Sequence, residues 1–258
     1  MSFIISRSIL FTYLLVLSFN SLSDSTDNTT APISPQPPYP AFTAHYQAEW
    51  KGGWFPITVN AIRSLNYDSE GNGELKFVAD SAIAGLEEVS SFRWQDEKIK
   101  PLRYRYLRSG LFSEPDRDQR FNWQQKNITN GETQAVFSGH WHDEVQDNLS
   151  YNLQASIDLK NGETQFTYPV FDRKKIKDFN FQLVKFETIN TRVGTLRTVK
   201  VELIENKKKK SKKKTFIWFA QDYDYLLVRL KQEQKDGQVY EINLTAAEIN
   251  GKTLKAKP

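Results

Sequence analysis

The stretch Phe42–Trp50, FTAHYQAEW, alternates apolar residues with small or polar ones. A period of two places every second side chain on the same face of an extended chain, so this stretch predicts a β-strand with one apolar face. Lys51-Gly52-Gly53 follows with the residue types of a turn. Apolar residues then return at Ile57, Val59 and Ala61, so we expect a β-hairpin here.

The same alternation recurs up to Ile249 at a spacing of roughly ten residues, with turn residues in between. The chain of 258 residues contains 6 Trp, 11 Tyr and 17 Phe. Aromatic side chains suit a pleated, half-buried surface better than a helix interior. We therefore expect a mainly β fold, a single-domain antiparallel barrel or half-barrel of about 11–13 strands.

One segment breaks the alternation. Leu149, Leu153 and Ile157 recur every four residues, which is the stripe of an amphipathic helix near residues 147–160. Asp147 is a suitable N-cap, and Gly162 lies just past the expected end. Because a sheet must bury its apolar side against another element, this helix is expected to cover one open face of a curved sheet.

The N-terminus has the layout of a secretory signal peptide. Arg7 precedes the apolar run Ile9–Phe19, and small residues at Ser21 and Ser23 fit a cleavage site after Ser23. An uncleaved N-terminal anchor is the alternative. The chain has no cysteine, which excludes disulfides, thiolate metal ligands and a lipid-modified cysteine. We expect export to the periplasm and a soluble processed product.

These signals divide the chain into a signal peptide at 1–23, a flexible proline-rich leader at 24–40, one β-rich domain at 41–251 and a tail at 252–258. No repeat of fixed period indicates a second domain. No later stretch is long and apolar enough for a membrane-spanning helix.

The basic character of the chain belongs to one segment. The sequence has 35 Lys+Arg against 31 Asp+Glu, and without a single lysine run the balance is acidic, so a nucleic-acid-binding face is not expected. The run could contact anionic lipid head groups, or it could be a solvated hairpin tip. It consists of Lys207, Lys208, Lys209, Lys210, Lys212, Lys213 and Lys214.

Aromatic residues at i and i+2 share a face of their strand and could line a cavity for an acyl chain or a sugar. The alternative is ordinary core filling, because aromatic side chains dominate many β-cores. The candidates are Phe92, Trp94, Tyr104, Tyr106, Phe121, Trp123 and Trp218.

Few residues suggest catalysis. His140 and His142 could share a metal ion, with His45 as a third ligand, or they could belong to a polar loop before the helix. Ser138 near His140 lacks the strand–turn–helix context of a nucleophilic serine. Glu87 and Glu88 point to opposite faces of any strand, which disfavours a paired acid and base. No cofactor is expected.

Three pieces of the sequence, in this order and spacing, resemble the exported bacterial proteins known as domain of unknown function 3108. They are Phe42-x-Ala44-x-Tyr46 with Gly52; Glu187–Gly194 running into Thr198–Val201; and Ile217–Asp222 followed by Val228-Arg229-Leu230. The likeness spans about Phe42 to Gly251 and departs at Leu227, where members often have proline. It implies a Gram-negative periplasmic protein with a barrel-like or half-barrel sheet, akin in shape to envelope carriers that shield lipid tails. It brings no activity and no catalytic residues.

Three hypotheses follow. The first is non-enzymatic binding of an apolar or amphipathic envelope component, a lipid or a lipoprotein-like molecule. The second is an interaction or scaffold protein of envelope assembly that contacts another envelope protein. The third is a metal-dependent hydrolase that uses His140 and His142.

Overall fold

The computed structural model describes residues 36–50, 57–110, 114–137, 141–205, 213–234 and 237–255. All of them belong to one compact unit of the chain. The expected signal peptide, the leader up to residue 35 and the turn at Lys51–Gly53 lie outside the described residues.

The described part contains fourteen strands and the helix α1 (Ser150–Lys160). The strands are β1 (Phe42–Trp50), β2 (Ile57–Tyr67), β3 (Gly73–Asp80), β4 (Ala84–Gln95), β5 (Lys98–Gly110), β6 (Arg117–Asn122), β7 (Asn127–Asn130), β8 (Gln165–Asp172), β9 (Lys175–Thr191), β10 (Gly194–Glu205), β11 (Lys214–Ala220), β12 (Leu226–Glu233), β13 (Val239–Ile249) and β14 (Lys252–Thr253).

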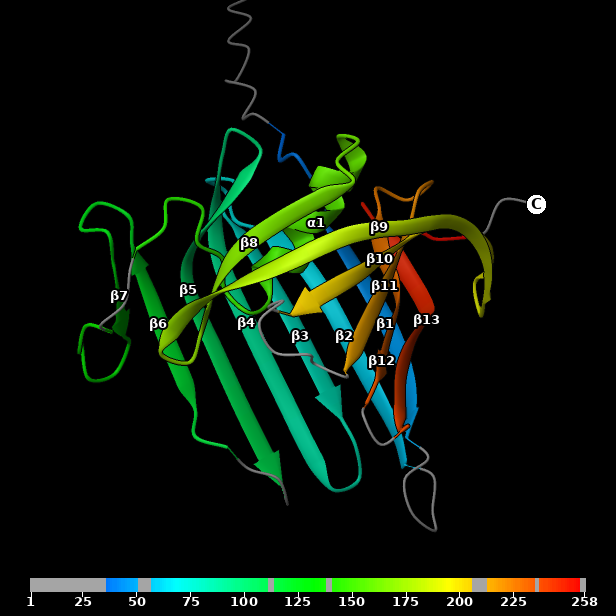
Figure 1. The fold of residues 1–258 in the computed structure, drawn as a ribbon, viewed down its shortest axis with the longest axis horizontal. Helices are drawn as coiled ribbons and strands as arrows, with labels where there is room; N and C mark the ends of the chain where they lie inside the picture. Colours follow the sequence, from blue (N-terminus) through cyan, green and yellow to red (C-terminus); the bar gives the residue numbers. More distant parts are fainter. Residues whose placement is uncertain are drawn as a thin grey trace, which may run out of the picture. The chain divides into compact units, whose positions relative to one another are not determined.

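The strands form one antiparallel sheet in the order β7-β6-β5-β4-β3-β2-β1-β13-β12-β11-β10-β9-β8, with β14 beside β13. Two meanders, β1–β7 and β8–β13, therefore meet where β1 pairs with β13. The sheet curls so that β8 and β9 cross in front of β2–β5, with α1 between the two layers (Figure 1). The expectation of a mainly β half-barrel with a single helix is confirmed, and the described sheet has fourteen strands where about 11–13 were expected.

The helix begins where Asp147 holds its first turn. The Asp147 carboxylate accepts hydrogen bonds from the backbone N–H groups of Leu149 and Ser150, both at 2.8 Å, and the Ser150 hydroxyl accepts one from the Asp147 N–H at 3.0 Å. Asp147 thus satisfies the first backbone N–H groups as a cap would, although the N-cap position itself is Leu149, two residues later than expected. The helix ends at Lys160, and Gly162 follows with φ +90°, a conformation that glycine adopts readily.

The helix is buried on its polar side as well as its apolar side. The Gln154 side chain accepts a hydrogen bond from the Ile99 N–H at 2.8 Å. Asp158 accepts one from the Tyr168 hydroxyl at 2.6 Å and pairs with Lys98 at 3.0 Å. Because β5 and β8 both hold α1 in this way, the helix fixes the distance between the two layers.

Gln146 bridges the seam between β8 and β5, although the sheet itself is open. Its backbone forms hydrogen bonds of 2.9 Å with Pro169 and Phe171 of β8, and its side-chain amide donates to the Ile99 carbonyl of β5 at 2.9 Å. One residue therefore ties β8 to β5 directly before α1. In the described part of the chain, no helix is long and apolar enough to cross a membrane.

Candidate functional site

Lateral pairing arranges the concave side chains of β1–β5 in rows that run across the strands. In the row beside α1 every side chain is at most 4% exposed. This row consists of Phe42, Leu65, Leu75, Ser90 and Tyr104. It belongs to the filled core, and Asp147 at the start of α1 accepts a hydrogen bond from the Ser90 hydroxyl at 2.5 Å.

The next two rows, further from α1, mark the end of the filled core. The second row consists of Ala44, Arg63, Phe77, Glu88 and Tyr106, and the third of Tyr46, Ala61, Ala79 and Leu86. Their side chains on β1 and β2 are buried, whereas the apolar side chains of Phe77, Ala79 and Leu86 are partly exposed. Beyond the filled core, the concave face therefore keeps partly exposed apolar side chains, and two charged residues, Arg63 and Glu88, stand among them.

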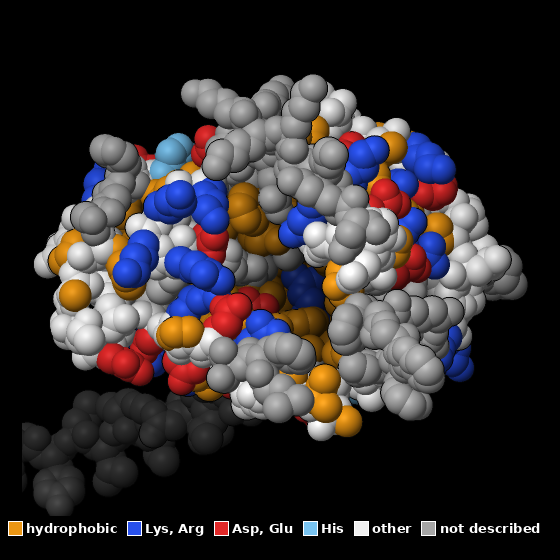
Figure 2. Space-filling view, turned by 60° about the horizontal axis from the view of Figure 1, so that its bottom comes forward, with side chains coloured by type: hydrophobic (Ala, Val, Ile, Leu, Met, Phe, Trp, Pro, Cys, Tyr) orange, Lys and Arg blue, Asp and Glu red, His pale blue; other side chains and the backbone are white. Residues whose placement is uncertain are grey.

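A hollow opens at this uncovered end. Figure 2, in which the lower end of the molecule comes forward, shows hydrophobic side chains around the hollow and Lys or Arg side chains deep inside it. Carboxylate side chains gather beside its opening. We call this feature the concave hollow and define it by its rows, from Arg63–Tyr106 to Ala61–Leu86.

Arg63 belongs to the second row, the one next to the filled core, and its side chain is 4% exposed. Its guanidinium carbon lies 5.5 Å from the centre of the Phe42 ring, and its side chain hydrogen-bonds to the Tyr46 hydroxyl. That hydroxyl donates onward to the Leu227 carbonyl at 2.7 Å. Burial raises the pKa of Tyr46 to about 12, while the nearby Arg63 charge acts in the opposite direction. Nη2 of Arg63 is buried without a hydrogen-bond partner.

Glu88 and Asp147 form an acidic pair at the border of the core. Burial raises the pKa of Glu88 to about 7, and the nearby Asp147 charge adds to this. The Tyr104 hydroxyl donates a hydrogen bond to Glu88, which acts against the rise. Burial also raises the pKa of Asp147. Since Asp147 is occupied by Ser90 and the helix start, it serves to hold α1 rather than to face a substrate.

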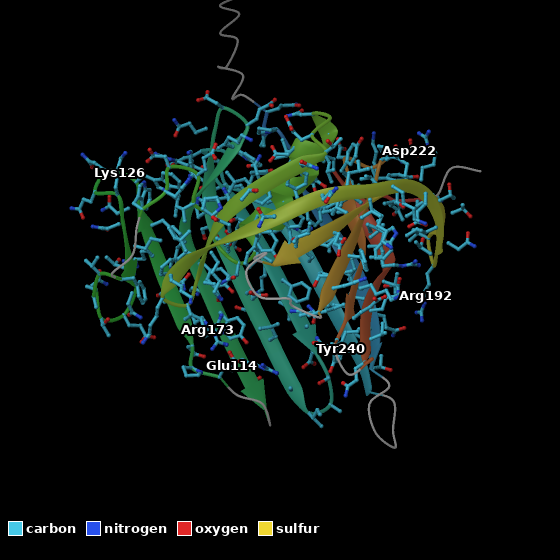
Figure 3. All side chains as sticks on the ribbon, in the orientation of Figure 1. Glu114, Lys126, Arg173, Arg192, Asp222 and Tyr240 are labelled. Atoms are coloured by element: carbon cyan, nitrogen blue, oxygen red, sulfur yellow. The ribbon has the colours of Figure 1, made fainter. Side chains whose placement is uncertain are left out.

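The rim of the hollow carries a network around Glu114, which precedes β6. Its carboxylate contacts Arg117 at 2.8 Å, Arg173 at 3.3 Å and Arg108 at 3.4 Å. Figure 3 shows Glu114 and Arg173 next to each other, although Arg173 belongs to the turn between β8 and β9. The network therefore joins the two layers on this side. It also gives an ionic partner to Arg117, which is in register with Tyr106 of the second row.

Five of the seven aromatic residues singled out from the sequence lie in three places. Phe92 and Tyr104 are fully buried in the core, with Trp94 packed edge-on against Phe92 at 5.2 Å between ring centres. Phe121 packs against Phe171 at 6.3 Å near the seam. Tyr106 is the one of the seven that stands in the second row, 8% exposed, with the Arg117 guanidinium 4.1 Å from its ring centre.

The two remaining tryptophans lie away from the hollow. Trp123 donates to the Pro101 carbonyl at 2.6 Å and packs against Trp141 at 4.9 Å between ring centres. Trp218 is on the convex face, in register with Lys200 and Arg229, whose charged groups lie 4.8 and 5.6 Å from its ring centre. The role of these seven residues in binding stays a prediction.

The structure describes only some of the histidines and lysines that the sequence singled out. His142 is exposed, and its ring accepts a hydrogen bond from the Glu144 N–H at 3.1 Å; His45 is exposed on β1. His140 lies outside the described residues, as do Lys207–Lys212. Among the described residues, no three acidic or histidine side chains are grouped to hold a metal ion. The metal and lysine hypotheses stay predictions.

A second depression, about 870 Å³ in volume, lies on the convex side. Most of its lining residues are of polar type, among them Gln47, Arg192, Arg229 and Asn243. Arg192 donates to the Gln47 side chain at 2.5 Å, and Arg229 to Asn243 at 2.6 Å. These groups are already partnered, and among the described residues none of the lining side chains has a buried polar atom without a hydrogen-bond partner.

Fold and hollow together define an open antiparallel half-barrel whose concave face is only partly filled by its helix. The family model described as "Protein of unknown function (DUF3108)" matches residues 42–245, and the chain belongs to this family. The resemblance expected from the sequence is thereby confirmed. No curated protein matches the chain.

Among solved structures, the chain is similar to a β-barrel-like protein of the DUF1849 family from Brucella abortus. The TM-score is 0.56 at 8% identity, over 82% of this chain and 98% of the other, and this likeness shows the fold alone. MucB in complex with MucA gives a TM-score of 0.30 at 11% identity, over 85% and 52% of the two chains. A Vibrio parahaemolyticus domain, provisionally described as outer-membrane lipoprotein-sorting, gives 0.25 at 10%, over 81% and 85%.

Sequence reasoning missed Arg63, and it treated Glu88 only as half of a Glu87–Glu88 pair. One signal was present: Ala61, Arg63 and Leu65 share a face of β2, so a charged residue occupies an apolar position. An arginine is rare at a buried position of a strand, because its charge then needs an ionic or hydrogen-bonding partner.

Proposed function

We propose that this protein binds an apolar or amphipathic molecule of the bacterial envelope in the concave hollow, without catalysing a reaction. The observation that carries the proposal is the apolar surface of Phe77, Ala79 and Leu86, which continues the core but is partly exposed. Covering such surface is favourable by roughly 25 cal/mol per Å². A hydrophobic tail laid against these rows would continue the core that α1 leaves unfinished.

The envelope address rests on the sequence. The N-terminal layout of Arg7, the apolar run Ile9–Phe19 and Ser23 favours export to the periplasm. A protein in the periplasm has access to the lipids and other amphiphilic molecules of the envelope. The DUF3108 family brings no activity that could be transferred.

A non-enzymatic role fits the acidic pair best. A general acid or base must reach the substrate proton by a hydrogen bond. Asp147 is fully buried, with its oxygens engaged by Ser90, Leu149 and Ser150. Tyr104, which bonds to Glu88, is fully buried as well. These contacts support a structural role for the pair.

Filling the hollow tests the proposal. Ala79 is on the concave face of β3, and its neighbour Val78 points to the opposite face, so Ala79→Phe and Val78→Phe place the same aromatic ring inside and outside. Binding is measured by the fluorescence of an apolar naphthylamine probe. The unmodified protein and Val78→Phe should bind it, and Ala79→Phe should weaken binding by about fivefold or more.

Two results would contradict the proposal. One is no fluorescence gain with the unmodified protein after bound lipid has been removed. The other is equal binding by Ala79→Phe and Val78→Phe, which would place the probe elsewhere. Thermal unfolding of both variants shows that each is folded.

A further inference from the structure

Arg63 is an unusual residue for its position. It is the one lysine or arginine among the buried side chains of the described residues. A buried cation is strongly unfavourable unless a charge or a full set of hydrogen bonds compensates it. Its neighbours in the row are Ala44 and Phe77, which offer no polar atom from their side chains.

The partners that Arg63 has are neutral. Tyr46 hydrogen-bonds to it and the Phe42 ring lies beside it. No described carboxylate lies within ion-pair distance of its guanidinium group, and Nη2 has no hydrogen-bond partner. The arginines nearby behave differently, because Arg108 and Arg117 both pair with Glu114. Of these three arginines, Arg63 is the one that is buried and has no ionic partner among the described residues.

The carboxylate that could have neutralised Arg63 is held elsewhere. Glu88 stands in the same row, on the far side of Phe77, and accepts its hydrogen bond from Tyr104. Adjacent strands lie about 5 Å apart, and β3 stands between β2 and β4, so the backbones at Arg63 and Glu88 are roughly 10 Å apart across the sheet. The structure keeps a cation and an acid apart at the inner end of an apolar hollow.

We propose that Arg63 is the anchor for the anionic head group of a single-tailed amphiphile, a carboxylate or a phosphate monoester, whose tail lies along the partly exposed rows. This inference rests on the proposed binding function and names the class of ligand. The planar guanidinium group suits bidentate pairing with either anion. Nη2 is shielded in this structure, so the side chain must turn about its terminal torsions toward the hollow, which an unbranched chain allows.

The ligand series that tests this keeps the tail constant and changes only the head. Dodecanoate, dodecyl phosphate, dodecanol and dodecyltrimethylammonium are each titrated against the naphthylamine probe on purified protein stripped of lipid. The unmodified protein should bind dodecanoate or dodecyl phosphate about tenfold more tightly than dodecanol, and the ammonium compound most weakly. Which of the two anions binds better distinguishes a fatty-acid-like from a phospholipid-like head group.

Variants locate the effect. Arg63→Met keeps an unbranched, flexible side chain but removes the guanidinium group and its charge, so it should bind dodecanol normally and lose the preference for the anions. Arg63→Lys should keep part of the preference. Arg93→Met is the matched control, because Arg93 is exposed on β4, and it should behave as the unmodified protein.

The outcomes separate the two proposals. If neither dodecanol nor the anions bind, the binding function itself fails. If dodecanol binds as tightly as dodecanoate, or if Arg63→Met keeps the preference, the hollow binds tails but Arg63 is not the anchor. The ranking with unmodified protein decides the matter even if Arg63→Met does not fold.

Discussion

Arg63 and Glu88 stand in one row of the sheet, on either side of Phe77, and do not form an ion pair. Glu88 turns to the Tyr104 hydroxyl and Arg63 to the Tyr46 hydroxyl. An ion pair would lower the pKa of Glu88, whereas burial raises that pKa to about 7. The row therefore presents an uncompensated cation and a readily protonated acid at the inner end of an apolar hollow.

Removing the Arg63 charge should stabilise the protein when no ligand is bound. Arg63→Met takes away a buried cation that lacks an ionic partner, so we expect the free energy of unfolding to rise by about 1–3 kcal/mol in urea titrations. Arg93→Met, on an exposed position, should change it by less than about 0.5 kcal/mol. A clear loss of stability in Arg63→Met would mean that the contacts of Arg63 with Phe42 and Tyr46 outweigh the cost of burying its charge.

Glu88 should make the protein less stable as the pH rises. Its pKa is about 7 in the folded chain against an ordinary value of 4.5, so the folded state holds the proton more tightly. The stabilisation is complete below pH 4.5 and is lost as the pH passes through 7, by at most about 3 kcal/mol. Unfolding of Glu88→Gln, measured from pH 4.5 to 8, should lack this part of the decline.

The control for Glu88→Gln is its neighbour Glu87→Gln. Glu87 lies on the opposite face and pairs with Lys76 at 2.8 Å, with both side chains more than 30% exposed. Its replacement should leave the pH dependence in place. If Glu88→Gln declines with pH as steeply as the unmodified protein, Glu88 is not the group responsible.

Asp147 should be essential for docking α1. Asp147→Ala removes the acceptor for two backbone N–H groups and for Ser90, so we expect a loss of about 2–4 kcal/mol in the free energy of unfolding. Glu144→Ala, at an exposed position just before the helix, should have little effect. Hydrogen exchange along 150–160 gives the local readout, and unchanged protection in Asp147→Ala would rule out this role.

Gly73 should be intolerant of a side chain because of Phe92. A Cβ atom at Gly73 would lie 2.3 Å from the Phe92 ring. We expect Gly73→Ala to cost about 1–3 kcal/mol, and Phe92→Leu in the same chain to recover part of this loss. Gly71→Ala is not a fair control, since Gly71 has a positive φ of +83°. Additive losses in the double variant would show that the two residues do not compete for the same space.

Much of the fold could be predicted because its signals are local. Alternation at Phe42–Trp50 and the four-residue repeat of Leu149, Leu153 and Ile157 each depend on neighbours in the chain. The role of Asp147 at the start of the helix could also be predicted from the sequence. The polar burial of α1 was not, because Gln154 and Asp158 find their partners on β5 and β8.

The candidate site was harder to predict because it depends on which face of the sheet becomes concave. Alternation shows that Phe216 and Trp218 share a face, but it does not show that this face is convex and covered by Lys200. The row of Arg63, Phe77 and Glu88 exists only through pairing between three strands. Arg63 at an apolar position of β2 was the one local clue.

The most direct test of the central claim is native mass spectrometry of the protein isolated from its own cells, followed by solvent extraction of anything bound. We predict an adduct of lipid size that is present in Val78→Phe and absent or much reduced in Ala79→Phe. The extract should contain an amphiphile with an anionic head group. A mass equal to the bare processed chain in every preparation, together with no uptake of added dodecanoate, would contradict the account.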